Sequence, residues 1–124
     1  MGERKTIMIV DDEPDVLLSV GQILEANNYR TIKAKDGHEC LEKLKEEIPD
    51  VLLLDIMMPG LTSKEILNAI EKDSRFAGIK IIFLTAVHML EAEEEDLLAL
   101  KQVVDFIGKP FTMRELLDAI EKTD

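Results

Sequence analysis

The chain has 124 residues, one cysteine and a formal net charge of −11, with 46% hydrophobic and 33% charged residues. This length suits one domain covering residues 1–124, and the negative charge argues against direct binding of nucleic acid or insertion at an anionic membrane surface. Because one cysteine cannot form an internal disulfide, and no signal-peptide or membrane-spanning segment is present, we expect a cytoplasmic protein.

Strand-like and helix-like patterns alternate along the whole chain. Short apolar runs predict strands buried on both faces, at about 6–10, 30–34, 51–55, 79–85 and 103–108. The intervening and final segments predict helices at about 14–27, 37–48, 63–73, 89–101 and 112–122. This alternation predicts an α/β fold with a parallel sheet and helices on both faces. Right-handed crossovers with one reversal give the strand order 2-1-3-4-5, the flavodoxin-like (βα)5 arrangement.

The predicted helices begin and end at recognisable residues. Thr62 to Glu65 and Thr112 to Glu115 both fit a capping box, in which a hydroxyl and a glutamate satisfy the first backbone N–H groups. Pro14 suits the first position of a helix, and Asn27-Asn28 suits a left-handed helix end. The segment near Lys101 has no such end signal.

Four of the apolar runs stop at residues that can bind metal or phosphate: Asp11-Asp12, Asp55, Thr85 and Lys109. Ligands of open α/β sheets bind beyond the carboxyl ends of the strands, so we expect these side chains to converge there. Clustered carboxylates need a compensating cation, and Mg²⁺ prefers such oxygen ligands. Asp55 could then attack a phosphoryl group. Lys109 and Thr85 would lie on the other side of Asp55, where Lys109 would neutralise the charge of the phosphoryl group and the Thr85 hydroxyl would hydrogen-bond one of its oxygens.

These residues fall within a set of motifs: Asp11-Asp12-Glu13-Pro14, Asp55 followed by Met57-Met58-Pro59-Gly60, Thr85-Ala86 and Lys109-Pro110-Phe111. Together they resemble the signature of the response-regulator receiver domain (CheY-like) of two-component signalling, and the resemblance covers essentially the whole chain.

The resemblance implies a phosphorylation-dependent switch rather than a conventional enzyme, with self-phosphorylation and self-dephosphorylation chemistry. It implies that Asp55 accepts a phosphoryl group from a sensor histidine kinase or a phosphotransfer protein. It further implies that Asp11, Asp12, Asp55 and the backbone carbonyl of Met57 hold Mg²⁺, with Mn²⁺ as an alternative. No other cofactor is expected.

Readout of the phosphoryl group is also implied by the resemblance. Thr85 and Lys109 would bind the phosphoryl group, Thr85 and Phe106 would act as the switch pair, and the peptide before Pro110 would be cis. The fourth helix, fifth strand and fifth helix would form the output surface. The acidic run at 91–96 is then either a solvated helix face or a docking surface for a basic partner. The downstream target or output domain is not specified, and a phosphorylation-dependent homodimer stays open.

Some positions depart from the family pattern. Met57 and Val87 are apolar where the family often has polar residues, and both could shield the acyl phosphate from water. We therefore predict slow self-dephosphorylation. Phe106 lacks a tyrosine hydroxyl, so burial alone should favour its inward position. Gln102-Val103 replaces the usual glycine-alanine pair, which leaves the local backbone undetermined.

Three other functions fit the sequence less well. An aspartate-nucleophile phosphatase generally has a second carboxylate two residues after the nucleophile, where this chain has Met57. A flavin or nucleotide binder needs a Gly/Ser/Thr-rich phosphate loop, whereas Asp11-Asp12-Glu13 would repel phosphate unless a metal intervened. An inactive receiver would lack site residues, and all of them are present here.

Overall fold

The computed structural model describes residues 4–56, 60–85 and 101–123. Its five strands form one parallel sheet in the order β2-β1-β3-β4-β5, as predicted. The strands are β1 (Thr6–Val10), β2 (Arg30–Ala34), β3 (Val51–Asp55), β4 (Lys80–Thr85) and β5 (Val103–Gly108). The helices are α1 (Pro14–Ala26), α2 (Gly37–Glu46), α3 (Ser63–Lys72), the short 3₁₀ helix η1 (Ser74–Phe76) and α5 (Met113–Glu121).

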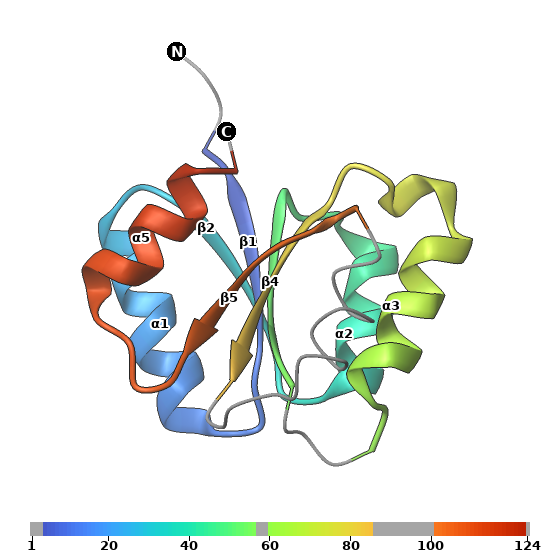
Figure 1. Cartoon of the computed structure of the whole chain (residues 1–124), viewed down its shortest axis with the longest axis horizontal. Helices are drawn as coiled ribbons and strands as arrows, with labels where there is room; N and C mark the ends of the chain where they lie inside the picture. The colour runs from blue at the N-terminus through green and yellow to red at the C-terminus, as the bar shows by residue number, and fades with distance from the viewer. Residues whose placement is uncertain (1–3, 57–59, 86–100, 124) are drawn as a thin grey trace.

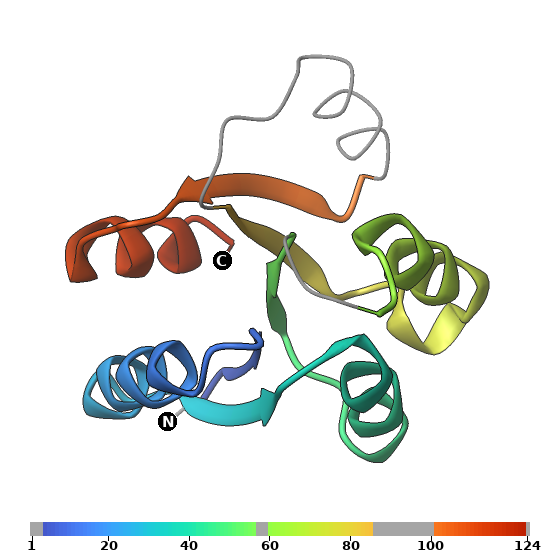
Figure 2. The same ribbon diagram turned by 90° about the horizontal axis from the view of Figure 1, so that it is seen from below.

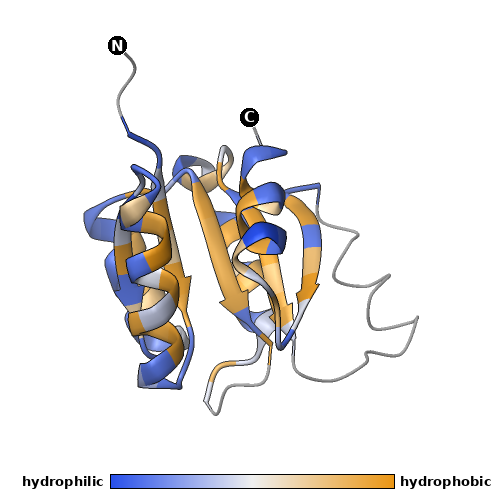
Figure 3. Cartoon of the chain, turned by 90° about the vertical axis from the view of Figure 1, so that its left-hand side faces the viewer, coloured by the Kyte–Doolittle hydropathy of each residue, from blue (hydrophilic) through white to orange (hydrophobic). Residues whose placement is uncertain are grey.

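The helices cover both faces of the sheet. Helices α1 and α5 lie on one face and α2 and α3 on the other, as Figures 1 and 2 show from two directions. The sheet lies between these two layers, and its strands are largely hydrophobic, as the orange colour in Figure 3 shows. Every residue of β1 and β3 is buried, as expected for parallel strands covered on both sides.

Alternating strand residues divide the buried side chains into two clusters, one on each face. Met8, Leu52 and Phe83 pack with α2 and α3 in the first cluster. Ile7 and Leu53 pack with α1 and α5 in the second. Among the described residues no helix is long and apolar enough to cross a membrane.

The predicted helix signals are confirmed. Both capping boxes form, with Thr62 and Thr112 accepting hydrogen bonds from the backbone N–H groups of Glu65 and Glu115. Pro14 is the first residue of α1, and Asn28 after that helix has a φ of 69°. The helix starts at Pro14, Thr62 and Thr112 follow the carboxyl ends of β1, β3 and β5, whereas Asn28 lies in the turn that leads into the start of β2.

Two local features differ from the sequence-based expectation. Helix α2 ends at Glu46 rather than near residue 48: Glu47 is already extended, with φ −148° and ψ 125°, and Pro49 disfavours helical geometry at Ile48. The unpredicted η1 begins where the Asp73 side chain accepts a hydrogen bond from the backbone N–H of Arg75. The helix predicted at 89–101 lies outside the described residues, apart from Lys101.

The start of β5, where Gln102 and Val103 depart from the family pattern, is held by side-chain hydrogen bonds. The Gln102 amide donates to the carbonyls of Phe76 and Ile79, at 2.7 and 2.9 Å. The pairing of β4 and β5 is irregular here, since Ile81 lies opposite Val103 but Ile82 lies opposite Asp105. The glutamine therefore ties the beginning of the edge strand β5 to the turn that precedes β4.

Candidate functional site

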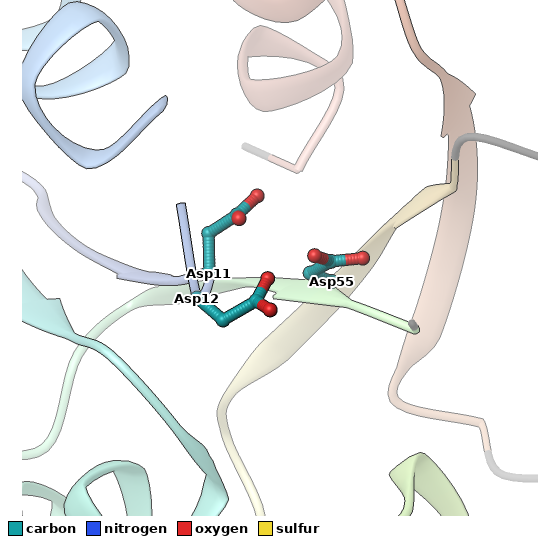
Figure 4. A group of neighbouring side chains, drawn as sticks. All are labelled: Asp11, Asp12 and Asp55. Carbon is teal, nitrogen blue, oxygen red and sulfur yellow. The ribbon is translucent and has the colours of Figure 1, made fainter. Parts of the chain in front are cut away.

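Two buried carboxylates lie at the ends of neighbouring strands. Asp55 is the last residue of β3 and is 3% exposed, while Asp11 directly follows β1 and is fully buried. Strands β1 and β3 pair in parallel up to Val10 opposite Leu54, which brings the residues that follow together. Asp12 is exposed beside them. The three predicted carboxylates therefore converge at one edge of the sheet (Figure 4).

This carboxylate cluster fits a divalent cation by its donor chemistry. Asp11, Asp12 and Asp55 each offer an oxygen within 4.8 Å of the others. Oxygen ligands of Mg²⁺ lie about 2.0–2.1 Å from the ion, so opposite ligands are about 4 Å apart. Oxygens within 4.8 Å of one another are therefore close to the spacing that a bound ion needs. The fourth predicted ligand, the carbonyl of Met57, lies outside the described residues.

Lys109 supplies the positive charge of the site. Its ammonium donates to Asp11 Oδ2 at 2.6 Å and to Asp55 Oδ2 at 3.4 Å, with only 13% of the side chain exposed. Burial lowers the pKa of Lys109, but the hydrogen bond to Asp11 and the charges of Asp55 and Asp11 outweigh it and raise the pKa overall. Lys109 therefore stays protonated at neutral pH.

The position of Lys109 corrects one detail of the sequence-based expectation. Lys109 was expected beside Asp55, on the side away from Asp11. Its Nζ is instead closer to Asp11 than to Asp55, and it also lies 3.8 Å from Glu13 Oε1. Glu13 was not predicted as a site residue. Its position directly after Asp11-Asp12 was the only sequence signal.

Thr85 ends β4 and lies at the same edge of the sheet. It is half-buried and lies opposite Gly108, and its carbonyl accepts a hydrogen bond from the backbone N–H of Lys109 at 2.6 Å. The peptide between Lys109 and Pro110 is cis, as the resemblance implied. The backbone thus links Thr85 directly to the segment that carries Lys109.

Phe106 lies within the edge strand β5. It is opposite Phe83 of β4, and the two rings stack with centroids 5.3 Å apart and planes at 23°. Phe106 is half-buried and packs against the cluster on the α2–α3 face. The ring thus packs onto the sheet face covered by α2 and α3, while the role of Phe106 in the switch stays a prediction.

An open groove of about 540 Å³ adjoins the site between α1 and the connection from β5 to α5. Val16, Val20 and Phe111 give it apolar walls, and Glu13 and Lys109 lie at the end nearest the carboxylates. The remaining functional predictions, for Val87 and the acidic run at 91–96, fall outside the described residues.

The arrangement favours a cation together with a phosphoryl group. In the described part of the chain, three carboxylates of the cluster face one ammonium, so an anion alone would be repelled. A divalent cation would balance the negative charge and leave Asp55 near Lys109, as phosphoryl transfer to a carboxylate requires.

Comparison with known proteins gives one consistent family. Residues 7–121 match the family described as the response regulator receiver domain. The chain is 31% identical over 119 residues to the phosphate regulon transcriptional regulatory protein PhoB of Escherichia coli (strain K12). That match covers 94% of this chain and 50% of PhoB, so the chain spans half the length of this curated relative.

Solved structures agree with this match. A CheY-like response regulator receiver domain protein from Methanospirillum hungatei JF-1 is 40% identical with a TM-score of 0.78, covering 95% of this chain and 90% of that one. The chemotaxis protein CheY4 of Vibrio cholerae is 25% identical with a TM-score of 0.89, covering 98% and 99% of the two chains.

Proposed function

Because this chain belongs to the family of response regulator receiver domains, which act as signalling domains in two-component systems, we propose that it is a switch controlled by phosphorylation of Asp55. The observation that supports this most is the placement of Asp55. Its carboxylate lies within 4.8 Å of those of Asp11 and Asp12 and 3.4 Å from the Lys109 ammonium. A nucleophile, a cation site and a fixed positive charge are thus adjacent.

We assign the metal site to Asp11, Asp12 and Asp55, together with the backbone carbonyl of Met57. Receiver domains generally use Mg²⁺, and the oxygen donors of this cluster suit it, with Mn²⁺ as an alternative. A bound divalent ion would neutralise charge on the incoming phosphoryl oxygens. Asp11 is fully buried and accepts a hydrogen bond from the backbone N–H of Glu13 at 2.9 Å, which fixes its orientation.

In the proposed transfer an Asp55 oxygen forms a bond to phosphorus. The bond between phosphorus and a histidine nitrogen of the donor breaks, and the electron pair leaves with that nitrogen. Lys109 remains beside Asp55 to compensate the charge of the acquired phosphoryl group, and the Thr85 hydroxyl donates a hydrogen bond to it. The donor would be a sensor histidine kinase or a phosphotransfer protein.

Phosphorylation would shift the conformational equilibrium of the protein from an inactive towards an active conformation. Thr85 and Lys109 are joined through the backbone hydrogen bond between β4 and the end of β5, so recruitment of either would pull on both strands. Phe106 on β5 would respond through its contact with Phe83. The resulting surface around the helix predicted at 89–101, β5 and α5 would control a downstream partner or a second copy of the chain.

The lifetime of the phosphorylated state is proposed from residues outside the described part of the chain. Apolar side chains at Met57 and Val87 would hinder a water molecule from attacking the acyl phosphate. We therefore expect slow self-dephosphorylation. A phosphorylated half-life of only seconds would contradict this.

Incubation with Mg²⁺ and acetyl phosphate, followed by intact-mass measurement, tests the assignment. Wild type should gain one phosphoryl group, whereas Asp55→Asn should gain none. Absence of an adduct on wild type, or equal adducts on both proteins, would refute the proposal. Size-exclusion chromatography of the same samples tests whether phosphorylation drives dimerisation.

A further inference from the structure

Among the residues that the structure describes, three carboxylates lie within ion-pair distance of the Lys109 ammonium. Asp11 and Asp55 lie at 2.6 and 3.4 Å and are almost fully buried, whereas Glu13 lies at 3.8 Å with 64% of its side chain exposed. The two inner carboxylates belong to the cation cluster, while Glu13 does not. Lys109 and a divalent cation would therefore compete for the carboxylate of Asp11. Glu13, by contrast, can pair with Lys109 without being a ligand of the cation.

Glu13 is held in place by its backbone. It precedes the first residue of α1, its N–H donates to Asp11 Oδ1, and its carbonyl accepts from the N–H groups of Val16 and Leu17. Its side chain makes no capping hydrogen bond to the helix. The carboxylate is therefore available to Lys109 without any loss of helix capping.

The groove described above gives Lys109 room to move. Glu13 and Lys109 both line it, at the end nearest the cluster. Nζ can turn from Asp11 towards Glu13 within this open volume, without displacement of the buried strands. A cation bound to Asp11 would repel an ammonium that now lies 2.6 Å from the same carboxylate, and so would favour this movement.

We propose that Glu13 is a positioning residue that receives the Lys109 ammonium when a divalent cation takes Asp11. The exchange keeps the lysine beside Asp55, ready for the phosphoryl group, while it frees an oxygen ligand for the metal. Glu13 thereby favours cation binding through Lys109. This inference rests on the proposed function, because it takes Asp11 as a metal ligand.

The test is calorimetric titration with Mg²⁺ of wild type, Glu13→Gln and Asp15→Asn. Asp15 is the matched control, since it is an exposed carboxylate that lines the same groove but, within the described residues, makes no ion pair with Lys109. Glu13→Gln should weaken Mg²⁺ binding by about two- to five-fold relative to Asp15→Asn, the range expected for an exposed ion pair. Equal affinities of the two variants would overturn the inference.

Repeating the titrations in a Lys109→Met background shows whether Glu13 affects Mg²⁺ affinity through Lys109 or by direct electrostatic attraction of the cation. In that background the additional effect of Glu13→Gln over Asp15→Asn should disappear. Its persistence would overturn the inference, because Glu13 would then act on the cation directly. Failure of wild type to bind Mg²⁺ at millimolar concentration would refute the proposed metal site itself, and the inference with it.

Discussion

Asp12→Asn should stabilise the fold when divalent cations are absent. An Asp12 oxygen lies within 4.8 Å of oxygens of both Asp11 and Asp55. Lys109 forms ion pairs with those two carboxylates, and within the described ranges no basic side chain pairs with Asp12. The repulsion on Asp12 is therefore largely uncompensated, and asparagine removes it at nearly constant volume.

The magnitude follows from the spacing. Two like charges 4.8 Å apart repel by about 3.5 kcal/mol at an effective dielectric constant of about 20, and by about 0.9 kcal/mol in bulk water. Because Asp12 is exposed, solvent screening moves the effect towards the lower value. We expect the free energy of unfolding to rise by about 1–2 kcal/mol.

Urea unfolding followed by circular dichroism measures this change. With EDTA present, the Asn variant should show a higher midpoint at an unchanged slope. Added Mg²⁺ should then stabilise wild type more than the variant, because binding to the folded state adds stability. Asp15→Asn serves as a control and should not stabilise, since Asp15 lies in the first turn of α1, where a negative charge is favourable. Equal or lower stability of Asp12→Asn in EDTA would refute the reasoning.

Three further predictions concern other parts of the molecule. Burial, with the nearby charge of Asp36, raises the pKa of the Cys40 thiol to about 12 in the folded protein. In the unfolded chain the same thiol has a pKa of about 8.5. At alkaline pH the unfolded state therefore binds fewer protons than the folded state, and a rise in pH favours unfolding. Wild type should therefore lose about 1 kcal/mol between about pH 8 and 9.5, and equal pH slopes for wild type and Cys40→Ala would contradict this. Thr112→Ala should lower the free energy of unfolding by about 1 kcal/mol in urea titrations, with Thr112→Ser close to wild type; no loss in the alanine variant would argue against the cap. Thr85→Ala should still be phosphorylated at Asp55, by intact mass, but lose the phosphorylation-dependent shifts of β5 amides in NMR spectra. A wild-type spectral response would exclude Thr85 as the coupling residue.

The strands and the carboxylate cluster could be predicted because they depend on local patterns and topology. Continuous apolar runs identified the buried strands, and the order 2-1-3-4-5 then placed Asp11 next to Asp55. Which carboxylate lies nearest the Lys109 ammonium could not be predicted. It depends on side-chain geometry between residues 98 positions apart, which no local pattern records.

Smaller errors have equally specific causes. Helix α2 is shorter than predicted because Glu47 turns to extended geometry, and Pro49 disfavours helical geometry at Ile48. The helix η1 was missed because one side-chain contact, from Asp73 to Arg75, organises a turn of only three residues. The irregular start of β5 depends on the reach of Gln102 to carbonyls more than twenty residues away, which the sequence does not indicate.

The division of the interior into two clusters allows the two faces of the sheet to change in sequence independently during evolution. Side chains on the α1–α5 face and on the α2–α3 face are separated by the sheet, so compensating substitutions need to arise only within one face. The carboxylate cluster of Asp11, Asp12 and Asp55 lies at the rim of the sheet, where it depends on strand ends more than on either helical layer. One layer can therefore accumulate changes that suit a new partner while the chemistry at the rim is inherited intact.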